Sequence, residues 1–153
     1  VNCLIPTGRR RIALINSSLR NNYAVKREEA YRACLAANGI DVKEEWILRL
    51  PDIDYNICLN SSTALLSMAD RPDAVFYQRR QGLGLDIPGD AAVVGFDNID
   101  ISTMTSPSIT TIAQPTYQIG TQACNMLMDQ IEYPGSTPRQ IILNTELILR
   151  NST

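Results

Sequence analysis

A short apolar run between a tight turn and a polar segment is the feature that most constrains how this chain can fold. A Pro-Gly-Asp turn signal at 88–90 precedes Ala91–Phe96, which is too brief for a helix and apolar enough to be buried on both faces. Such runs are typical of a central strand in a parallel sheet. The sequence then changes abruptly to Asp-Asn-Ile-Asp at 97–100. Because open α/β sheets bind ligands beyond the carboxyl ends of their strands, Asp97 is the first candidate ligand-binding residue.

The length and charge of the chain favour one ordinary globular domain. It has 153 residues, of which 44% are hydrophobic and 20% charged, and its net charge is −2. Without a basic surplus it lacks the electrostatic footprint of a nucleic-acid-binding surface, and the three arginines at 9–11 are expected to solvate the start of a strand. No apolar run is long enough to span a membrane and no signal peptide opens the chain, so we expect a cytoplasmic location.

The cysteine and histidine content excludes several kinds of chemistry. The four cysteines are spread singly, without a C-x-x-C pair, and there is no histidine. A zinc site is therefore not expected, and neither a Ser-His-Asp nor a Cys-His catalytic arrangement is possible within this chain. The separate cysteines suit reduced thiols of a cytosolic protein.

Short apolar runs alternate with helical patterns along the chain, which predicts an α/β fold with parallel strands. Strands are expected at 11–16, 47–50, 73–77, 91–96, 108–113 and 141–149. Helices are expected at 23–38, 63–69 and 117–132, the tail of an earlier helix at 1–7, and loops at 52–60 and 99–107.

The connection between the strands at 73–77 and 91–96 is unusually short. A crossover between parallel strands needs a dozen or more residues and normally holds a helix. Here barely that many residues are available, and they include three glycines and a proline. Either this crossover is a loop or residues are absent from the sequence near 77–80, and the second interpretation is preferred.

Arg27 is the second informative residue, because a cation heads the stripe of its helix that should face inward. The stripe is expected to comprise Arg27, Ala30, Tyr31, Cys34 and Leu35. Arg27 could extend to water or pair with Glu28 or another nearby carboxylate. It could instead reach a ligand, because its helix starts just past the carboxyl end of one strand and Asp97 follows another, so both lie at one edge of a parallel sheet. Together they suit a polyhydroxylated sugar or a heterocycle with donors and acceptors, although a structural salt bridge is equally compatible.

Signatures of phosphate binding and catalysis are missing. The loop after the first strand, NSSLRNNYAVKREEA, has no G-x-G-x-x-G, and no G-x-x-x-x-G-K-[ST] occurs. Asp97 and Asp100 could be proposed as an acid/base pair, but neighbouring carboxylates in a turn more often cap backbone amides. We therefore expect neither an enzyme nor a cofactor.

Two motifs carry a family resemblance. IPGDAAVVGFDN fits the pattern I-P-x-D-x-x-V-x-G-F-D-N, and TTIAQPTYQIG fits T-T-I-x-Q-P-x-x-x-I-G. With GRRRIALINSS, VKREEAYRACLAANGI, RPDAVF and ELILRNST in the same order, nearly the whole chain resembles the sensor domain of the LacI/GalR family of bacterial transcription regulators, in the branch of the purine, ribose and cytidine repressors.

The resemblance implies a doubly wound, mostly parallel sheet that forms one subdomain of a type I periplasmic-binding-protein-like fold. Residues 1–113 would be the carboxyl-terminal effector-binding subdomain. Residues 114–153 would hold a crossover hinge at Gln114 and Pro115, a helix that packs on a missing first subdomain, and a returning strand. The family's helix-turn-helix domain and its N-D-x-x-A-x-G helix after the DAVF strand are absent from this sequence.

The resemblance also implies effector-binding residues. Arg27 matches the arginine of the R-x-x-G-Y helix, with Ala30 in place of the glycine, and Asp97 matches the aspartate of G-F-D-N. Asn16 and Asn22 bound the loop over the ligand, and Asp52 falls in the pocket wall.

The function implied is effector sensing by a homodimeric LacI-type repressor. A sugar or nucleoside-like effector would change the closure of the two subdomains and thereby operator binding through a domain not present in this chain, with no membrane partner. Two alternatives remain open, a periplasmic sugar-binding protein of a transporter, which shares the fold, and a small α/β enzyme that uses Asp97.

Overall fold

A six-stranded sheet organises the part of the chain that the computed structural model describes, which is residues 1–18, 22–51, 55–76, 86–137 and 139–153. The strands lie in the order β2-β1-β3-β4-β5-β6. Pairs from β2 to β5 are parallel, and β6 is antiparallel to β5. The strands are β1 (Ile12–Ser17), β2 (Ile47–Leu50), β3 (Ala74–Phe76), β4 (Ala92–Phe96), β5 (Thr110–Ala113) and β6 (Glu146–Ile148). The helices are α1 (Asn22–Ala37), α2 (Tyr55–Leu66), α3 (Ile101–Met104) and α4 (Thr116–Glu132), with a 3₁₀ turn η1 (Glu44–Trp46). The predicted parallel α/β architecture is confirmed.

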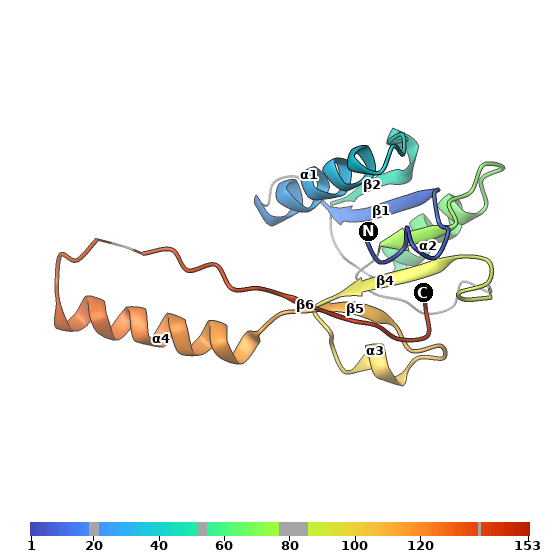
Figure 1. Cartoon of the computed structure of the whole chain (residues 1–153). Helices are drawn as coiled ribbons and strands as arrows, with labels where there is room; N and C mark the ends of the chain where they lie inside the picture. Colours follow the sequence, from blue (N-terminus) through green and yellow to red (C-terminus); the bar gives the residue numbers. More distant parts are fainter. Residues whose placement is uncertain (19–21, 52–54, 77–85, 138) are drawn as a thin grey trace.

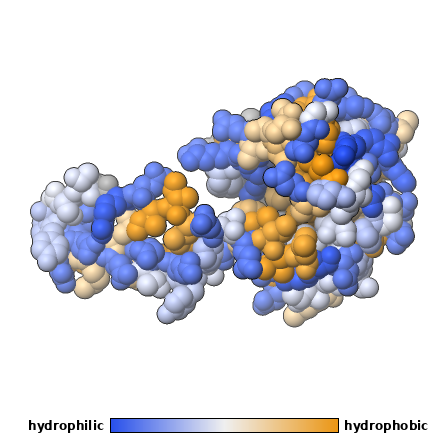
Figure 2. Space-filling view, viewed as in Figure 1, coloured by the Kyte–Doolittle hydropathy of each residue, from blue (hydrophilic) through white to orange (hydrophobic). Residues whose placement is uncertain are grey.

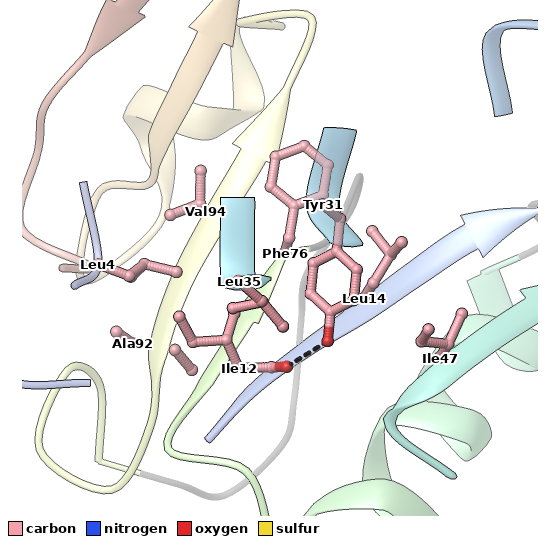
Figure 3. Close-up of a cluster of buried hydrophobic side chains, with 10 residues drawn as sticks. Leu4, Ile12, Leu14, Tyr31, Leu35, Ile47, Phe76, Ala92 and Val94 are labelled. Carbon is pink, nitrogen blue, oxygen red and sulfur yellow. Dashed lines mark hydrogen bonds between the residues drawn. The ribbon is translucent and has the colours of Figure 1, made fainter. Parts of the chain in front are cut away.

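Both faces of the inner strands β1, β3 and β4 are covered, because successive residues point to opposite sides of the sheet and both sets are buried. Ile12 and Leu14 of β1 pack with α1 residues Tyr31 and Leu35, as Figure 3 shows. The Tyr31 hydroxyl donates a hydrogen bond of 2.7 Å to the Ile12 carbonyl.

On the opposite face, alternate residues of the same strands pack with the end of α2. This second core consists of Ala13, Ile15, Trp46, Leu50, Leu65, Leu66, Val75 and Ala91. A sheet with a helix on each face is the doubly wound arrangement expected.

The buried stripe of α1 differs from the predicted one. Its buried residues are Ala24, Glu28, Tyr31 and Leu35, whereas Ala30 is exposed and Arg27 is only half-buried. The stripe is therefore rotated around the helix, and an acidic residue takes the place that spacing had given to Arg27.

Four boundaries also differ from the sequence expectation. Residues 2–8 form turns rather than a helix end, and α2 begins at Tyr55, inside the segment expected to be a loop. A single helical turn, α3, interrupts the loop expected at 99–107. The last strand covers only 146–148, because its ladder partner in β5 is the short stretch Thr111–Ala113. The prediction that residues are missing from the sequence near 77–80 concerns a segment outside the described residues.

An arm made of α4 and the chain that returns from it extends away from the sheet (Figure 1). No residue of α4 is buried, and several of its large apolar side chains are exposed on the arm (Figure 2). They include Tyr117, Ile119, Leu127, Met128 and Ile131. An amphipathic helix normally buries its apolar stripe, so this surface is available to another packing partner.

Within those ranges, no helix is both long enough and apolar enough to cross a lipid bilayer.

Candidate functional site

The sheet order creates a natural ligand crevice at the carboxyl ends of β1, β3 and β4. After β1 the chain moves outward to β2, and it then crosses β1 to form β3 on the other side. The helices that leave neighbouring strands at such a switch point diverge and leave a gap at the carboxyl edge. A cavity of about 580 Å³ lies there. Its described lining residues are Tyr23, Lys26, Arg27, Phe76, Phe96, Asp97 and Gln114.

Arg27 enters the cavity from the second turn of α1 and rests on aromatic rings. The centre of its guanidinium lies 4.7 Å from the centroid of the Phe96 ring and 5.9 Å from that of Phe76. The Phe76 and Phe96 rings meet edge to face, with centroids 6.5 Å apart. Guanidinium groups are attracted to aromatic faces at such separations, so the rings hold the planar head in one orientation.

Burial lowers the pKa of Arg27, and the negative charge of Asp97 partly offsets this effect. Because the ordinary pKa of arginine is so high, the group stays charged at neutral pH. The cavity thus contains a permanent, partly desolvated cation that faces an acidic residue.

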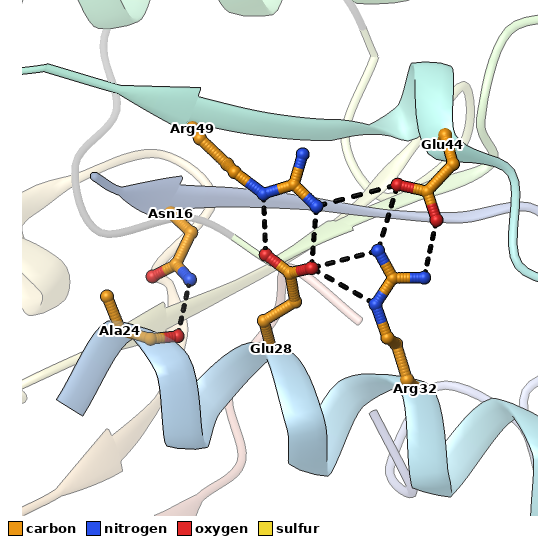
Figure 4. A network of polar contacts seen from close by, with 6 residues as sticks. All are labelled: Asn16, Ala24, Glu28, Arg32, Glu44 and Arg49. Carbon is orange, nitrogen blue, oxygen red and sulfur yellow. Dashed lines mark hydrogen bonds and ion pairs between the residues drawn. The ribbon is translucent and has the colours of Figure 1, made fainter. Parts of the chain in front are cut away.

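Asn16 lies behind Arg27 instead of lining the cavity. Its side chain is buried, donates a 2.8 Å hydrogen bond to the Ala24 carbonyl, and accepts one of 3.3 Å from Arg27 Nη1. Figure 4 shows the first of these bonds. Asn16 therefore ties the end of β1 to the first turn of α1 and positions Arg27.

Asp97 begins a left-handed turn directly after β4. Asp97 and Asn98 have φ values of 75° and 48°, a conformation that non-glycine residues adopt rarely, with Asp and Asn the most tolerant. Two hydrogen bonds of Asn98 hold the turn in place. Its backbone N–H donates to Thr111 Oγ1 at 3.2 Å, and its side-chain Oδ1 accepts from Arg150 Nη2 at 2.7 Å. The Gln114 side-chain amide donates a hydrogen bond to Asp97 Oδ1.

The remaining sequence-predicted residues have different outcomes. Asn22 is the first residue of α1 and is exposed, and it is not among the described residues that line the cavity. Pro115 directly precedes α4. Asp52 lies outside the described residues. The structure thus brings Arg27, Asp97 and Gln114 together.

Sequence reasoning missed most of the cavity wall. Phe76 and Phe96 are the last residues of β3 and β4 on the α1 face, a position that the two-residue alternation of strands could have identified. Tyr23 and Lys26 precede Arg27 by four and one residues on the same helix. Gln114 was predicted only as a hinge residue, although it also lines the cavity.

Glu28 does not serve as the partner of Arg27, one alternative considered from the sequence. Its carboxylate accepts hydrogen bonds from Arg49 of β2 at 2.6 and 2.8 Å and from Arg32 at 2.8 and 3.0 Å (Figure 4). Both arginines also contact Glu44. The hydrogen bonds from Arg49 lower the pKa of Glu28 most, burial opposes them, and Arg32 adds to the lowering. This network fixes α1 to β2 and leaves Arg27 to the cavity.

Comparison with known proteins relates this chain to the periplasmic binding protein-like domain and to bacterial transcriptional repressors. The family model for the periplasmic binding protein-like domain matches residues 1–153. The ribose operon repressor of Haemophilus influenzae is 31% identical over 97% of this chain and 48% of its own length. The transcriptional repressor CytR of Escherichia coli K12 is 33% identical over 100% of this chain and 48% of its own length. The chain thus spans about half the length of these relatives.

A solved structure supports the same relationship. The transcriptional regulator CelR, determined as a complex with cellobiose, superposes with a TM-score of 0.87 at 31% identity. The superposition covers 99% of this chain and 49% of that one.

Proposed function

The chain belongs to the LacI/GalR family of bacterial transcription regulators, and from this membership we propose that it is the effector-sensing part of a LacI-type repressor. A small effector, either a sugar or a nucleoside-like molecule, binds in the cavity at the carboxyl ends of β1, β3 and β4. Binding changes the affinity of the whole protein, a cytoplasmic homodimer, for its operator DNA. This function involves no catalysis, in keeping with relatives that are transcriptional repressors.

The observation that carries this proposal is the meeting of Arg27 and Asp97 in one cavity, although they come from separate strand–helix junctions. Arginine offers several donors in a fixed plane, and an ionised aspartate offers only acceptors. Hydroxyl groups of a sugar, or the edge of a base, can satisfy both. The rings of Phe76 and Phe96 add apolar surface of the kind that packs against a sugar ring or a base. The cellobiose complex of CelR supports a carbohydrate as the effector class.

Gln114 supplies a route from the cavity to the rest of the protein. Its amide binds Asp97 Oδ1, and it stands one residue before Pro115 and two before α4. An effector that takes this carboxylate oxygen displaces the Gln114 amide, so occupancy of the cavity and the direction of the α4 arm depend on each other. Gln114 and Pro115 then act as the hinge whose two positions the effector selects.

The same proposal assigns the domain organisation. Residues 1–113 form the effector-binding subdomain, and in the whole protein the exposed apolar side chains of α4 pack on a second subdomain. This arrangement accounts for an amphipathic helix with no buried residue in the described chain.

Calorimetry of effector binding to the whole protein tests the site. Arg27→Ala and Asp97→Ala should each weaken binding by about 2–3 kcal/mol, because each leaves a polar group of the effector without its partner in a desolvated cleft. The matched control is Arg10→Ala, a change of an exposed arginine before the amino end of β1, at the opposite edge of the sheet. Affinity unchanged by both cavity variants would reject the site.

The alternative of a periplasmic sugar-binding protein predicts a different sequence upstream of this domain in the gene. It requires a signal peptide ahead of the binding domain, whereas a repressor requires a helix-turn-helix. The relatives that match this chain over nearly its whole length are repressors, which favours the second. Sequencing the region that encodes residues upstream of Val1 decides between them.

A further inference from the structure

The described lining of the cavity carries more positive than negative charge. Lys26 and Arg27 contribute two cations, whereas Asp97 contributes the one carboxylate among the described lining residues. That carboxylate already accepts a hydrogen bond from Gln114. The described part of the lining therefore has more donors than acceptors and more positive than negative charge.

The charge of Arg27 is incompletely compensated within the described chain. Among the described residues it hydrogen-bonds the neutral Asn16 amide oxygen at 3.3 Å and lies over the Phe96, Phe76 and Tyr23 rings, and Asp97 is the acidic residue that acts on its charge. The contrast with the neighbouring arginines is clear, because Arg32 and Arg49 of the Glu28 network each contact carboxylates at 2.5–2.8 Å. Burial lowers the pKa of Arg27, and the negative charge of Asp97 partly opposes this lowering.

Lys26 strengthens this imbalance from the same helix. Its side chain is exposed and lines the cavity, so it can reorient toward a ligand bound there. Both cations lie in the second turn of α1, next to each other in the sequence. A Lys26 side chain that only solvates the surface would contribute nothing to ligand affinity.

We propose that the effector carries an anionic group, a phosphate or a carboxylate, which Lys26 and Arg27 bind while Asp97 and Phe96 contact its neutral part. This inference rests on the proposed function, since it specifies the charge of the molecule that the sensor binds. Lys26 is then a specificity-determining residue that separates charged from neutral forms of the same sugar or nucleoside.

Matched pairs of ligands test the charge preference directly. Calorimetry on the whole protein would compare ribose with ribose 5-phosphate, glucose with glucose 6-phosphate and glucuronate, and cytidine with cytidine 5′-monophosphate. At least one charged member should bind about tenfold or more tightly than its neutral partner at low salt, and this ratio should fall as ionic strength rises, because part of the site is exposed. The glucuronate and glucose 6-phosphate arms distinguish a carboxylate from a phosphate.

Two variants separate a specific contact from a change in net charge. Lys26→Gln should weaken binding of the charged ligand by roughly threefold to fivefold, the upper range for a partly solvated pair, and leave the neutral partner within twofold. Arg10→Gln makes the same change in net charge at the opposite edge of the sheet and should alter neither affinity.

The outcomes distinguish this inference from the proposed function. Equal or tighter binding of the neutral members, equal effects of Lys26→Gln and Arg10→Gln, or no binding of any charged member would overturn the inference. A neutral ligand whose binding is lost in Arg27→Ala would still support the sensor. Binding of charged ligands that is insensitive to both Arg27→Ala and Asp97→Ala would reject the proposed site itself.

Discussion

Replacing Glu28 by glutamine should destabilise the folded chain measurably, because the buried carboxylate links α1 to β2. Glutamine has nearly the same size but loses the negative charge and turns one acceptor into a donor that faces arginine. The four hydrogen bonds that Glu28 accepts from Arg32 and Arg49 are 2.6–3.0 Å long.

The magnitude follows from the exposure of the groups. The Glu28 side chain is 9% exposed, whereas those of Arg32 and Arg49 are 33% and 35% exposed. Hydrogen bonds to charged groups contribute about 1.5–3 kcal/mol each when buried, and exposed ion pairs under about 1 kcal/mol. Both arginines are partly solvated, so the hydrogen bonds of Glu28 contribute less than buried ones and more than an exposed ion pair. We expect Glu28→Gln to lower the free energy of unfolding by about 2–3 kcal/mol, or roughly 4–12 °C in Tm for a domain of this size.

Urea and thermal unfolding of the wild type, Glu28→Gln and the control Glu29→Gln provide the assay. Glu29 is exposed on the same helix, so its substitution should change the free energy of unfolding by less than about 0.5 kcal/mol.

The pH dependence adds a second criterion. The pKa of Glu28 is lower in the folded than in the unfolded state, so its stabilisation is complete above the unfolded value, about 4.3, and is lost as the pH falls through the folded value. The difference between wild type and Glu28→Gln should therefore be constant from pH 6 to 8 and shrink on acidification. Equal stabilities at pH 7, or a difference that persists at pH 2, would refute this account of the network.

Three further changes test other parts of the structure. Phe96→Leu should lower the free energy of unfolding by about 1–2 kcal/mol, since it removes the ring on which Arg27 rests, and denaturant unfolding that shows no change would contradict this. Burial raises the pKa of Tyr31 to about 12, so the wild type should lose stability above about pH 10, where the unfolded tyrosine ionises. Tyr31→Phe should be about 1–2 kcal/mol less stable at pH 7, because the Ile12 carbonyl loses its hydrogen-bond donor. Above about pH 10 the variant should lose less stability than the wild type, because it has no tyrosine to ionise at this position. Unfolding of both proteins as a function of pH measures this difference. Leu127→Lys should change the stability of the 153-residue chain by less than about 0.5 kcal/mol, because Leu127 is exposed, but should cost more than about 2 kcal/mol in a whole protein whose second subdomain covers α4; equal effects in both would argue against that cover.

The fold was largely predictable because its central strands are short runs buried on both faces. Ala91–Phe96 and Arg11–Asn16 differ from the observed β4 and β1 by one residue at either end at most. The amino end of α2 was not predictable in this way, because two of its first six residues are asparagines, which favour turns, and two serines follow them. The apolar residues at 141–143 were assigned to a strand, but their pattern cannot reveal that β5 is too short to pair with them.

The site was only partly predictable, for a physical reason. The sequence identified Arg27 and Asp97 because each breaks a local apolar pattern. It could not show that Glu28 of α1 is buried, since the compensating cation Arg49 lies on β2, which is distant in the sequence. It likewise could not show that Gln114 reaches Asp97, because that contact depends on how β5 lies beside β4.

A crystal structure of the whole protein with its effector bound is the most direct test of the sensing site. The account predicts one ligand within hydrogen-bond distance of both the Arg27 guanidinium and the Asp97 carboxylate, packed on the Phe96 ring, with the Gln114 amide displaced from Asp97. A ligand bound elsewhere, or Arg27 and Asp97 occupied by protein groups while the effector is present, would contradict it.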